Sequence, residues 1–516
     1  MKRGPHLARW ETGLLAALAL WSLVPLGLVA IPELGGPSGA ERGRFTGTDG
    51  LQVADHLQYL AWVRDAGENL LFSNRFDTVS DPHLFLHPMF VLSGLAWKLG
   101  ASLQVALLAW KVVGVLVLFL GYRAYVRRTV PEGAGAQAAV LALALFFFTP
   151  AAPIADWLGH RDDATGFGTL VMGLSMFPAG TVFGGAPVAV ALGLMALFLV
   201  AVERLLAGPA RPALVAATAA AGLLVSWLHP WQGLTLLGIL AGLWAWSRFD
   251  RAHLRLAVPV LATAAPFLYY AVLSRTDSAW ADVSTPSDAA HVGSWFWLAV
   301  VPVVALAALG IRRPGPAVRE RVLLLWPAAA FAVYFALDRS FFYHALLGLS
   351  LPLAVLGARA WQRVRLPRAA AVAAVGLLTL PGMVLYTQLV AQDARDHFLH
   401  EDEARAMDDL HDAERPGPVV STAEFGRAVP AFAGRNTWVG HPTWTPGYQD
   451  RARRADELFD GRLSPADARA LVTSTGAAFA VSDCRHDADL TAALAPLTRS
   501  VRRFGCAEVI ELRGGG

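Results

Sequence analysis

Long apolar runs alternate with short polar segments along the first three quarters of the chain. A helix that crosses a membrane needs about 20 predominantly apolar residues, so each long run is a candidate span. The first run is too long for the core of a signal peptide and more runs follow it, which favours a membrane anchor. The pattern predicts an α-helical polytopic membrane protein with about eleven spans, near 11–31, 102–122, 134–152, 186–205, 212–229, 231–247, 255–274, 293–311, 322–337, 341–360 and 369–390.

The arginines between these runs predict the orientation of the chain. Basic residues concentrate in alternate short connections, which is typical of cytoplasmic loops. The basic set comprises Arg127, Arg128, Arg204, Arg211, Arg248, Arg251, Arg255, Arg312, Arg313, Arg319, Arg321, Arg363, Arg365 and Arg368. The intervening short loops each hold about one basic residue, namely Arg161, Arg275 or Arg339. We therefore expect a multi-pass protein of the inner or plasma membrane, with a cytoplasmic N-terminus and an extracytoplasmic C-terminus.

The connection between the first two runs, residues 32–101, is long and is expected to face outward. Within it, residues 85–98 are apolar but too few to cross a bilayer. We interpret this stretch as a helix that lies at the membrane interface, with Trp97 and Lys98 at the level of the headgroups. If it spanned the membrane, the arginine pattern downstream would be inverted.

The character of the sequence changes near residue 391, where charged residues replace the apolar runs. Short apolar stretches alternate there with helical patterns, which predicts a small α/β domain. We expect strands at 418–421, 437–440, 478–482 and 508–512, and helices at 401–415, 449–459 and 464–475. The predicted organisation is a transmembrane module over 1–390 and a soluble extracytoplasmic domain over 391–516. The latter has no Gly-rich phosphate loop and no nucleophile elbow, so we expect it to cover a site or bind a ligand.

Composition agrees with a membrane protein, because 55% of the residues are hydrophobic and only 16% are charged. The formal net charge of +3 gives no indication of nucleic-acid binding. The two cysteines, Cys484 and Cys506, lack zinc-ligand spacing, so we expect no structural metal site. They can form a disulfide if the domain is extracytoplasmic, or remain two buried thiols.

Candidate chemistry begins in the first outer loop, where Asp49, Asp55 and His56 lie among aromatic residues. Asp55, Tyr59 and Trp62 have the spacing that places residues on one face of a helix. A carboxylate beside aromatic rings suits a sugar site, in which the acid accepts a hydroxyl proton. The alternative is a solvated helix with an ordinary aromatic packing face. His87, which precedes Pro88, is either a ligand-binding residue or a simple helix start.

Lys111 lies about nine residues into the second predicted span. At about 1.5 Å per residue that is roughly 13 Å deep. An ionisable residue at such depth is a functional candidate by default. The alternative is an ion pair that stabilises the helix bundle.

Two further outward-facing segments carry charge. The second outer loop contains Asp156, His160, Arg161, Asp162 and Asp163. This group can bind a divalent cation, or its arginine can meet a phosphate, although acids in a loop are also simply soluble.

Arg339 and Tyr343 lie at the outer end of a later span. They can hold a lipid phosphate or anchor the helix at the interface.

These motifs in this order resemble the GT-C glycosyltransferases, in particular the group of the protein O-mannosyltransferases and the lipid A aminoarabinose transferase. The stretch HPMFVLSGLAWKLGASLQVALLAWKVVGVLVLFLGYRAYVRR is similar in layout to a segment of that group, and DRSFFYHALLGLSLPLAVLGARAW resembles its later span. The resemblance implies that an outer-loop acid, Asp55, is the catalytic base. It implies that Lys111 and Arg339 hold the phosphate of a polyprenyl-phosphate sugar.

The chain departs from that group at two motifs. Asp55-His56 replaces a common Asp-Glu, and His87-Pro88-Met89 replaces His-Pro-Pro. The first departure leaves Asp49 as an alternative base.

The resulting hypothesis is an inverting transfer of a sugar from a polyprenyl-phosphate donor to a glycan, lipid or protein acceptor outside the membrane. His56, Tyr59, His87, Lys111, His160, Arg161, Asp162, Arg339 and Tyr343 are the predicted substrate-binding residues. A divalent cation is compatible with the sequence but is not required by it. The rival hypotheses are a transporter or flippase for a lipid-linked intermediate and a GT-C-like scaffold without activity.

Overall fold

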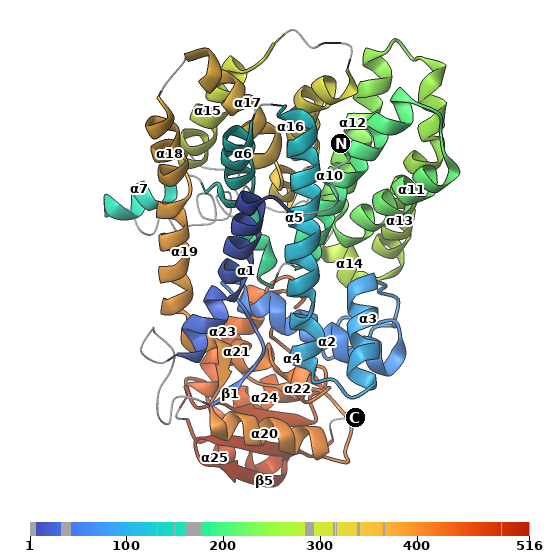
Figure 1. Cartoon of the computed structure of the whole chain (residues 1–516). Helices are drawn as coiled ribbons and strands as arrows, with labels where there is room; N and C mark the ends of the chain where they lie inside the picture. The colour runs from blue at the N-terminus through green and yellow to red at the C-terminus, as the bar shows by residue number, and fades with distance from the viewer. Residues whose placement is uncertain are drawn as a thin grey trace. The chain divides into compact units, whose positions relative to one another are not determined.

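The chain is mostly helical in the computed structural model (Figure 1). The structure describes residues 7–31, 43–131, 133–148, 151–159, 177–184, 186–283, 294–312, 315, 317–337, 341–364, 367–486 and 488–514. The chain divides into two compact units, each assembled from segments distant in sequence. The helical unit comprises Met1–Val24, Trp110–Val272 and Thr285–Leu389, and the mixed unit comprises Pro25–Ala109, Leu273–Ser284 and Val390–Gly516.

Every predicted span contains helix in the structure. The helices in these regions are α1 (Arg9–Ala30), α4 (Leu103–Leu108), α5 (Trp110–Thr129), α6 (Ala134–Phe146), α10 (Ala186–Ala207), α11 (Pro212–Leu228), α12 (Pro230–Trp246), α13 (Ala257–Thr276), α15 (Ser294–Leu309), α16 (Val318–Ala336), α17 (Ser350–Val364), α18 (Arg368–Leu377) and α19 (Leu380–Gln392). Shorter helices also occur, among them α7 (Ala151–Trp157), α14 (Ser278–Val283) and the 3-10 helices η3 (Pro178–Val182), η4 (Arg251–Leu256) and η5 (Phe342–Leu346).

Within the described residues, five helical segments are long and apolar enough to cross a membrane: Arg9–Ala30, Leu103–Thr129, Ala186–Ala207, Arg251–Thr276 and Arg368–Gln392. The other predicted spans are helical, but they are shorter or carry more charge. Their role as spans therefore stays a prediction.

Glycines allow two helices of the helical unit to approach closely. A Cβ atom built on Gly193 of α10 would lie 2.2 Å from the carbonyl oxygen of Val117 on α5. A Cβ atom on Gly121 would lie 2.1 Å from the carbonyl oxygen of Gly193. Small residues at such contacts let backbones pack closely where water cannot drive association. Figure 1 shows α5 and α10 side by side.

Several arginines of the predicted cytoplasmic loops are paired with carboxylates inside the helical unit. Arg127 lies 2.6 Å from Glu11, whose side chain is fully buried. Arg128 lies 2.8 Å from Glu203, and Arg319 lies 3.7 Å from the same carboxylate group. These arginines therefore join neighbouring helices in addition to marking the predicted cytoplasmic side.

The mixed unit contains a four-stranded sheet with the order β3-β4-β6-β5. Its strands are β3 (Val419–Val420), β4 (Phe479–Ser482), β5 (Thr498–Phe504) and β6 (Ala507–Leu512), and only the β3–β4 pair is parallel among them. The helices around it include α20 (Glu401–Asp412), α23 (Tyr448–Phe459), α24 (Pro465–Thr475) and α25 (Leu490–Leu494). Val420, Phe459, Leu471 and Ile510 lie in one buried cluster. Burying such a side chain contributes roughly 1.5–3 kcal/mol.

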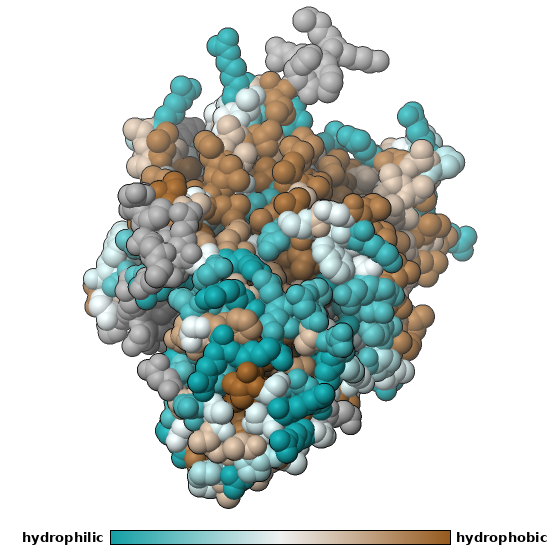
Figure 2. Space-filling model, turned by 90° about the horizontal axis from the view of Figure 1, so that it is seen from below, coloured by the Kyte–Doolittle hydropathy of each residue, from teal (hydrophilic) through white to brown (hydrophobic). Residues whose placement is uncertain are grey.

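One strand prediction in this region is wrong, and one strand was not predicted. Residues 437–440 form no strand, because Thr437 makes only an isolated bridge to Val419. The edge strand β5 was not expected, because its arginines interrupt the apolar pattern. Its polar side chains pair with neighbouring acids, as Arg502 does with Asp409 at 2.8 Å. The surface around α20 and α25 is mostly hydrophilic in Figure 2.

Residues of the predicted first outer loop belong to the same unit as this sheet. Strand β1 (Arg44–Phe45) pairs antiparallel with β2 (Phe398–Leu399). Helix α2 (Val53–Asn69) is joined to α22 (Val429–Phe432) by Arg64, whose Nη1 donates to the carbonyl oxygens of residues 431 and 432 at 3.2 and 2.9 Å. The loop is therefore built into a shared core.

The apolar stretch predicted to lie at the interface forms α3 (Pro88–Lys98), an 11-residue helix. It packs against α2, where a Cβ on Gly94 would lie 2.5 Å from the nitrogen of Gly67. Cys484 and Cys506 form a disulfide that joins the turn after β4 to the turn between β5 and β6.

Candidate active site

Asp55 lies in the first turn of α2, with 37% of its side chain exposed. The helix forms because Val53, Leu57 and Leu60 recur at helical spacing and are buried. It ends at Leu70, which adopts a positive φ of 70°. An acid in the first turn is favoured by the partial positive charge of the helix N-terminus. The fold thus presents Asp55 as a partly exposed carboxylate on a rigid element.

His441 is a hydrogen-bond partner of Asp55, although the two residues are 386 positions apart. Its Nε2 lies 2.9 Å from Asp55 Oδ1. The backbone N–H of Thr443 donates to His441 Nδ1 at 3.0 Å, so in the neutral ring the proton is on Nε2. His441 therefore donates to Asp55. The side chain of His441 is 4% exposed and its ring packs on Phe76, with centroids 5.6 Å apart, which fixes its orientation.

Asp55 lines an open cavity of about 260 Å³ in the mixed unit. The other charged side chains in its wall are Asp393, Asp396 and Arg427, and the first residues of α2 complete the wall. Asp396 lies 3.1 Å from Arg485. Burial, together with the neighbouring Asp396, raises the pKa of Asp393 above its ordinary value. We call this space the Asp55 cavity.

The arrangement suits proton abstraction from a hydroxyl group. His441 occupies Oδ1 of Asp55, and among the described residues Oδ2 has no hydrogen-bond partner. A positioned carboxylate within reach of a hydroxyl acts as a general base. Asp55 lines the cavity, so a hydroxyl-bearing ligand bound there lies beside this carboxylate.

Asp49 and His56 lie in the loop that leads into α2 and in its first turn. The backbone N–H of Asp49 donates to His56 Nδ1 at 2.8 Å, and both residues are 2% exposed. Neither residue is among those that line the Asp55 cavity. In these positions they hold the loop against the helix.

Tyr59, Trp62 and His87 belong to an aromatic cluster. Tyr59 lies 5.1 Å from Phe90 between ring centroids, and His87 lies 4.5 Å from the same ring. Trp62 is 7% exposed and therefore packs in the core. His87 is also the N-cap residue of α3, without a side-chain capping hydrogen bond. The spacing of Asp55, Tyr59 and Trp62 thus produces a packing face, with the acid at its exposed end.

Lys111 lies in the helical unit and is 6% exposed. Its Nζ donates to the carbonyl oxygen of Ser22 at 2.7 Å and lies 5.2 Å from the centroid of Phe183. A carbonyl oxygen and an aromatic face both attract an ammonium group. Lys111 is therefore stabilised as a buried cation by neighbours on other helices.

Tyr343 is buried in η5, with its ring centroid 4.7 Å from that of His344. His344 lies 5.1 Å from His229, and Gln232 donates to the carbonyl oxygens of His344 and Leu347. Tyr343 thus belongs to a cluster of rings in the helical unit.

Four predicted site residues, His160, Arg161, Asp162 and Arg339, lie outside the described residues.

Sequence reasoning missed His441, Asp393, Asp396 and Arg427. They lie near the C-terminal part of the chain, far in sequence from Asp55. A buried histidine leaves no local pattern, because its role depends on what lies opposite it in the fold. The sole local hint is that Asp393 and Asp396 begin the polar segment that follows the last apolar run.

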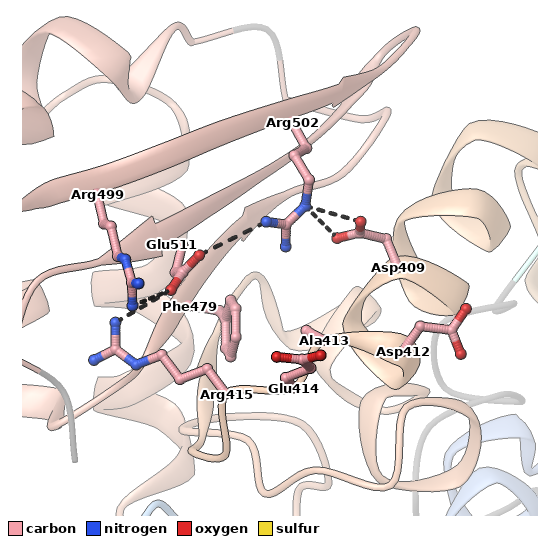
Figure 3. Close-up of a pocket in the computed structure, with 9 residues that line it drawn as sticks. All are labelled: Asp409, Asp412, Ala413, Glu414, Arg415, Phe479, Arg499, Arg502 and Glu511. Carbon is pink, nitrogen blue, oxygen red and sulfur yellow. Dashed lines mark hydrogen bonds and ion pairs between the residues drawn. The ribbon is translucent and has the colours of Figure 1, made fainter.

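A larger cavity, of about 600 Å³, lies between β5 and the end of α20 (Figure 3). Its arginines already have carboxylate partners. Arg499 lies 3.1 Å from Glu511, and Arg502 lies between Asp409 and Glu511. None of the predicted site residues lines this cavity, and its larger volume is not in itself evidence of a function.

Comparison with known proteins supports the fold. No protein-family model matches the chain, and no curated protein matches it. The chain is similar to the structure of ArnT from Cupriavidus metallidurans in the apo state, with 15% identity over 97% of both chains and a TM-score of 0.51. It is also similar to ArnT bound to undecaprenyl phosphate, at 15% identity, 98% coverage of both chains and a TM-score of 0.49.

A third similar structure is the apo oligosaccharyltransferase of Archaeoglobus fulgidus. The two chains share 16% sequence identity, the match covers 94% of this chain and 71% of that chain, and the TM-score is 0.46. Of these three structures, apo ArnT is the one with a TM-score above 0.5. The chain therefore has the fold of a GT-C glycosyltransferase, as the sequence resemblance implied.

Proposed function

We propose that this protein transfers a sugar from a polyprenyl-phosphate donor to an acceptor on the extracytoplasmic side, with inversion at the anomeric carbon. Asp55 is the general base. The observation that carries the proposal is the hydrogen bond from the buried His441 to Asp55 Oδ1, at a cavity that leaves Oδ2 for a ligand.

The proposed step balances as a displacement. The acceptor hydroxyl gives its proton to Asp55 Oδ2, and its oxygen forms the new bond to the anomeric carbon. The bond from that carbon to the donor phosphate breaks, and the polyprenyl phosphate leaves with the electron pair. Lys111, Arg161 and Arg339 are the proposed cations that offset the charge on this phosphate. Such electrostatic stabilisation of the transition state is usually the largest contribution to the rate enhancement of an enzyme.

The class of donor is proposed from residues and from fold together. A fold shared with ArnT agrees with a lipid-linked donor, and ArnT has been solved with undecaprenyl phosphate bound. A buried lysine held by a carbonyl and a ring, as Lys111 is, supplies a positive charge for such a phosphate. A divalent cation remains compatible with this scheme.

The membrane arrangement is part of the proposal. We propose about eleven spans, a cytoplasmic N-terminus and an extracytoplasmic domain over 391–516. The Cys484–Cys506 disulfide supports an extracytoplasmic location of this domain, because disulfides persist in oxidising compartments. The composition change near residue 391 supports the boundary.

The test uses full-length protein in lipid nanodiscs with labelled polyprenyl-phosphate sugars. Asp55→Asn keeps the size of the side chain but removes the base, so transfer should fall about 10²–10⁴-fold. Asp450→Asn, on the exposed face of α23, is the matched control and should leave transfer unchanged. Transfer at the wild-type rate in Asp55→Asn would eliminate Asp55 as the base, and Asp49→Asn would then be the next variant.

A further inference from the structure

The Asp55 cavity contains a hydrogen-bond donor without an acceptor. Arg427 lines the cavity, and among the described residues its guanidinium group has no hydrogen-bond partner. Guanidinium groups in folded proteins usually donate to an acceptor, so an unpaired one at a cavity wall indicates a ligand. Gln52, the N-cap residue of α2 in the same wall, makes no side-chain capping hydrogen bond. The first turn of α2 therefore adds donors that its own cap does not satisfy.

The charges around the cavity indicate a neutral ligand. Asp396 is neutralised by Arg485 at 3.1 Å, and Asp393 and Arg427 carry opposite formal charges. Asp55 alone then remains, and it is the proposed base. A phosphate would meet three carboxylates in this wall, whereas a neutral ligand with many hydroxyl groups meets both acceptors and donors.

The size of the cavity limits the ligand further. About 260 Å³ is slightly below the range of roughly 300–1,000 Å³ that holds drug-sized ligands. It suits a single ring better than an extended chain. The carboxylates and the guanidinium are unfavourable for an acyl chain, which would leave them without partners.

We infer that the Asp55 cavity binds one sugar ring of a glycan acceptor. Asp393 and Arg427 hold hydroxyl groups of that ring, and one hydroxyl lies at Asp55 Oδ2. The inference rests on the proposed function and deepens it, because it selects a glycan from among glycan, lipid and protein acceptors.

The experiment measures binding of free methyl glycosides (mannoside, glucoside, galactoside and N-acetylglucosaminide) to the full-length protein in nanodiscs by saturation-transfer NMR. At least one glycoside should bind to wild type. Arg427→Gln and Asp393→Asn should each weaken that binding about tenfold or more, since each loses a hydrogen bond to a charged group. Arg453→Gln, an exposed residue on α23, is the control and should bind as wild type does.

Each outcome decides one of the two proposals. No glycoside binding, or binding that both variants leave unchanged, overturns the inference. So does wild-type transfer to a hydroxyl-bearing peptide or lipid that no glycoside inhibits. If one variant fails to fold, judged by its melting temperature, the other decides. Asp55→Asn should lose transfer; transfer at the wild-type rate in this variant would overturn the proposed function without affecting the binding result for Arg427→Gln and Asp393→Asn.

Discussion

A single backbone N–H group determines which nitrogen of the neutral His441 ring carries the proton. Because Thr443 donates to Nδ1, the ring presents an N–H donor at Nε2 toward Asp55. The hydrogen bond holds one oxygen of the carboxylate, so the other keeps a constant direction. His441 is a positioning residue in this scheme, since it acts on the reaction through Asp55.

Replacing His441 tests this role. His441→Ala should lower kcat about ten- to a hundredfold with little change in KM, because loss of a hydrogen bond to a charged group costs about 1.5–3 kcal/mol. His441→Gln retains a donor near the Nε2 position and should recover most of kcat. Steady-state transfer assays on both variants, with melting temperatures as a fold control, give the comparison. Equal rates for Ala and Gln would contradict the positioning role.

Asp81 lies in the mixed unit, in the predicted first outer loop. Burial, and the charges of Asp277 and Asp77, raise the pKa of Asp81 to about 6. A carboxyl group with a raised pKa in the folded state binds its proton there more tightly than when unfolded. Its contribution to stability is therefore lost as the pH rises from about 4 to about 6.

Asp81→Asn removes the free-energy cost of ionising this carboxyl group in the folded protein. Its melting temperature should exceed that of wild type at pH 7.5 and match it at pH ~3, below the pKa of the carboxyl group in the unfolded chain, because the protonated acid and the amide are then neutral in both states. Thermal unfolding scans at the two pH values measure the difference, with Asp450→Asn as a control that should shift little at either. An equal gain at both pH values would mean that ionisation of Asp81 is not the cause.

At the scale of elements, the contact between α5 and α10 depends on the absence of side chains at two glycines. Gly121 and Gly193 place the backbone of each helix against the other. Because the atoms they would meet belong to backbone, neither helix can make room by a change of rotamer.

Gly193→Ala should therefore destabilise the protein by about 1–3 kcal/mol through overpacking. Gly357→Ala is the matched control, because Gly357 also lies inside a helix of the helical unit and a Cβ atom added there would meet no atom within 4 Å. Alanine has the higher helix propensity, so the control should be neutral or slightly stabilising. Melting temperatures in one detergent compare the two variants. A smaller loss for Gly193→Ala than for Gly357→Ala would contradict the close approach.

At the scale of the whole molecule, orientation is the property on which the proposed function depends. The two native cysteines are joined in a disulfide, so an introduced cysteine is the sole free thiol. Asp460→Cys, an exposed site after α23, should react with an impermeant maleimide in intact spheroplasts. Gly133→Cys, in a predicted cytoplasmic loop, should react only after permeabilisation. The opposite labelling would invert the orientation and remove the proposed extracytoplasmic transfer.

The sequence by itself determined the helices and the change in character near residue 391. Both follow from runs of about 20 residues, over which apolar content and helical spacing are visible without knowledge of distant partners. Helices α20, α23 and α24 begin within a few residues of their predicted starts for the same reason. The edge strand β5 was missed because arginines that pair with acids elsewhere hide its pattern.

Tertiary structure alone decided what surrounds Asp55. The sequence selected that acid from its position in a short aromatic-rich helix, but it gave two interpretations of Tyr59 and Trp62, and burial shows a packing face. His441 reaches Asp55 from a segment 386 positions away, and Arg427 reaches the cavity from a nearby part of the chain, where no local spacing records either contact. The physical reason is that a helix is encoded by neighbours along the chain, whereas a site is encoded by neighbours in space.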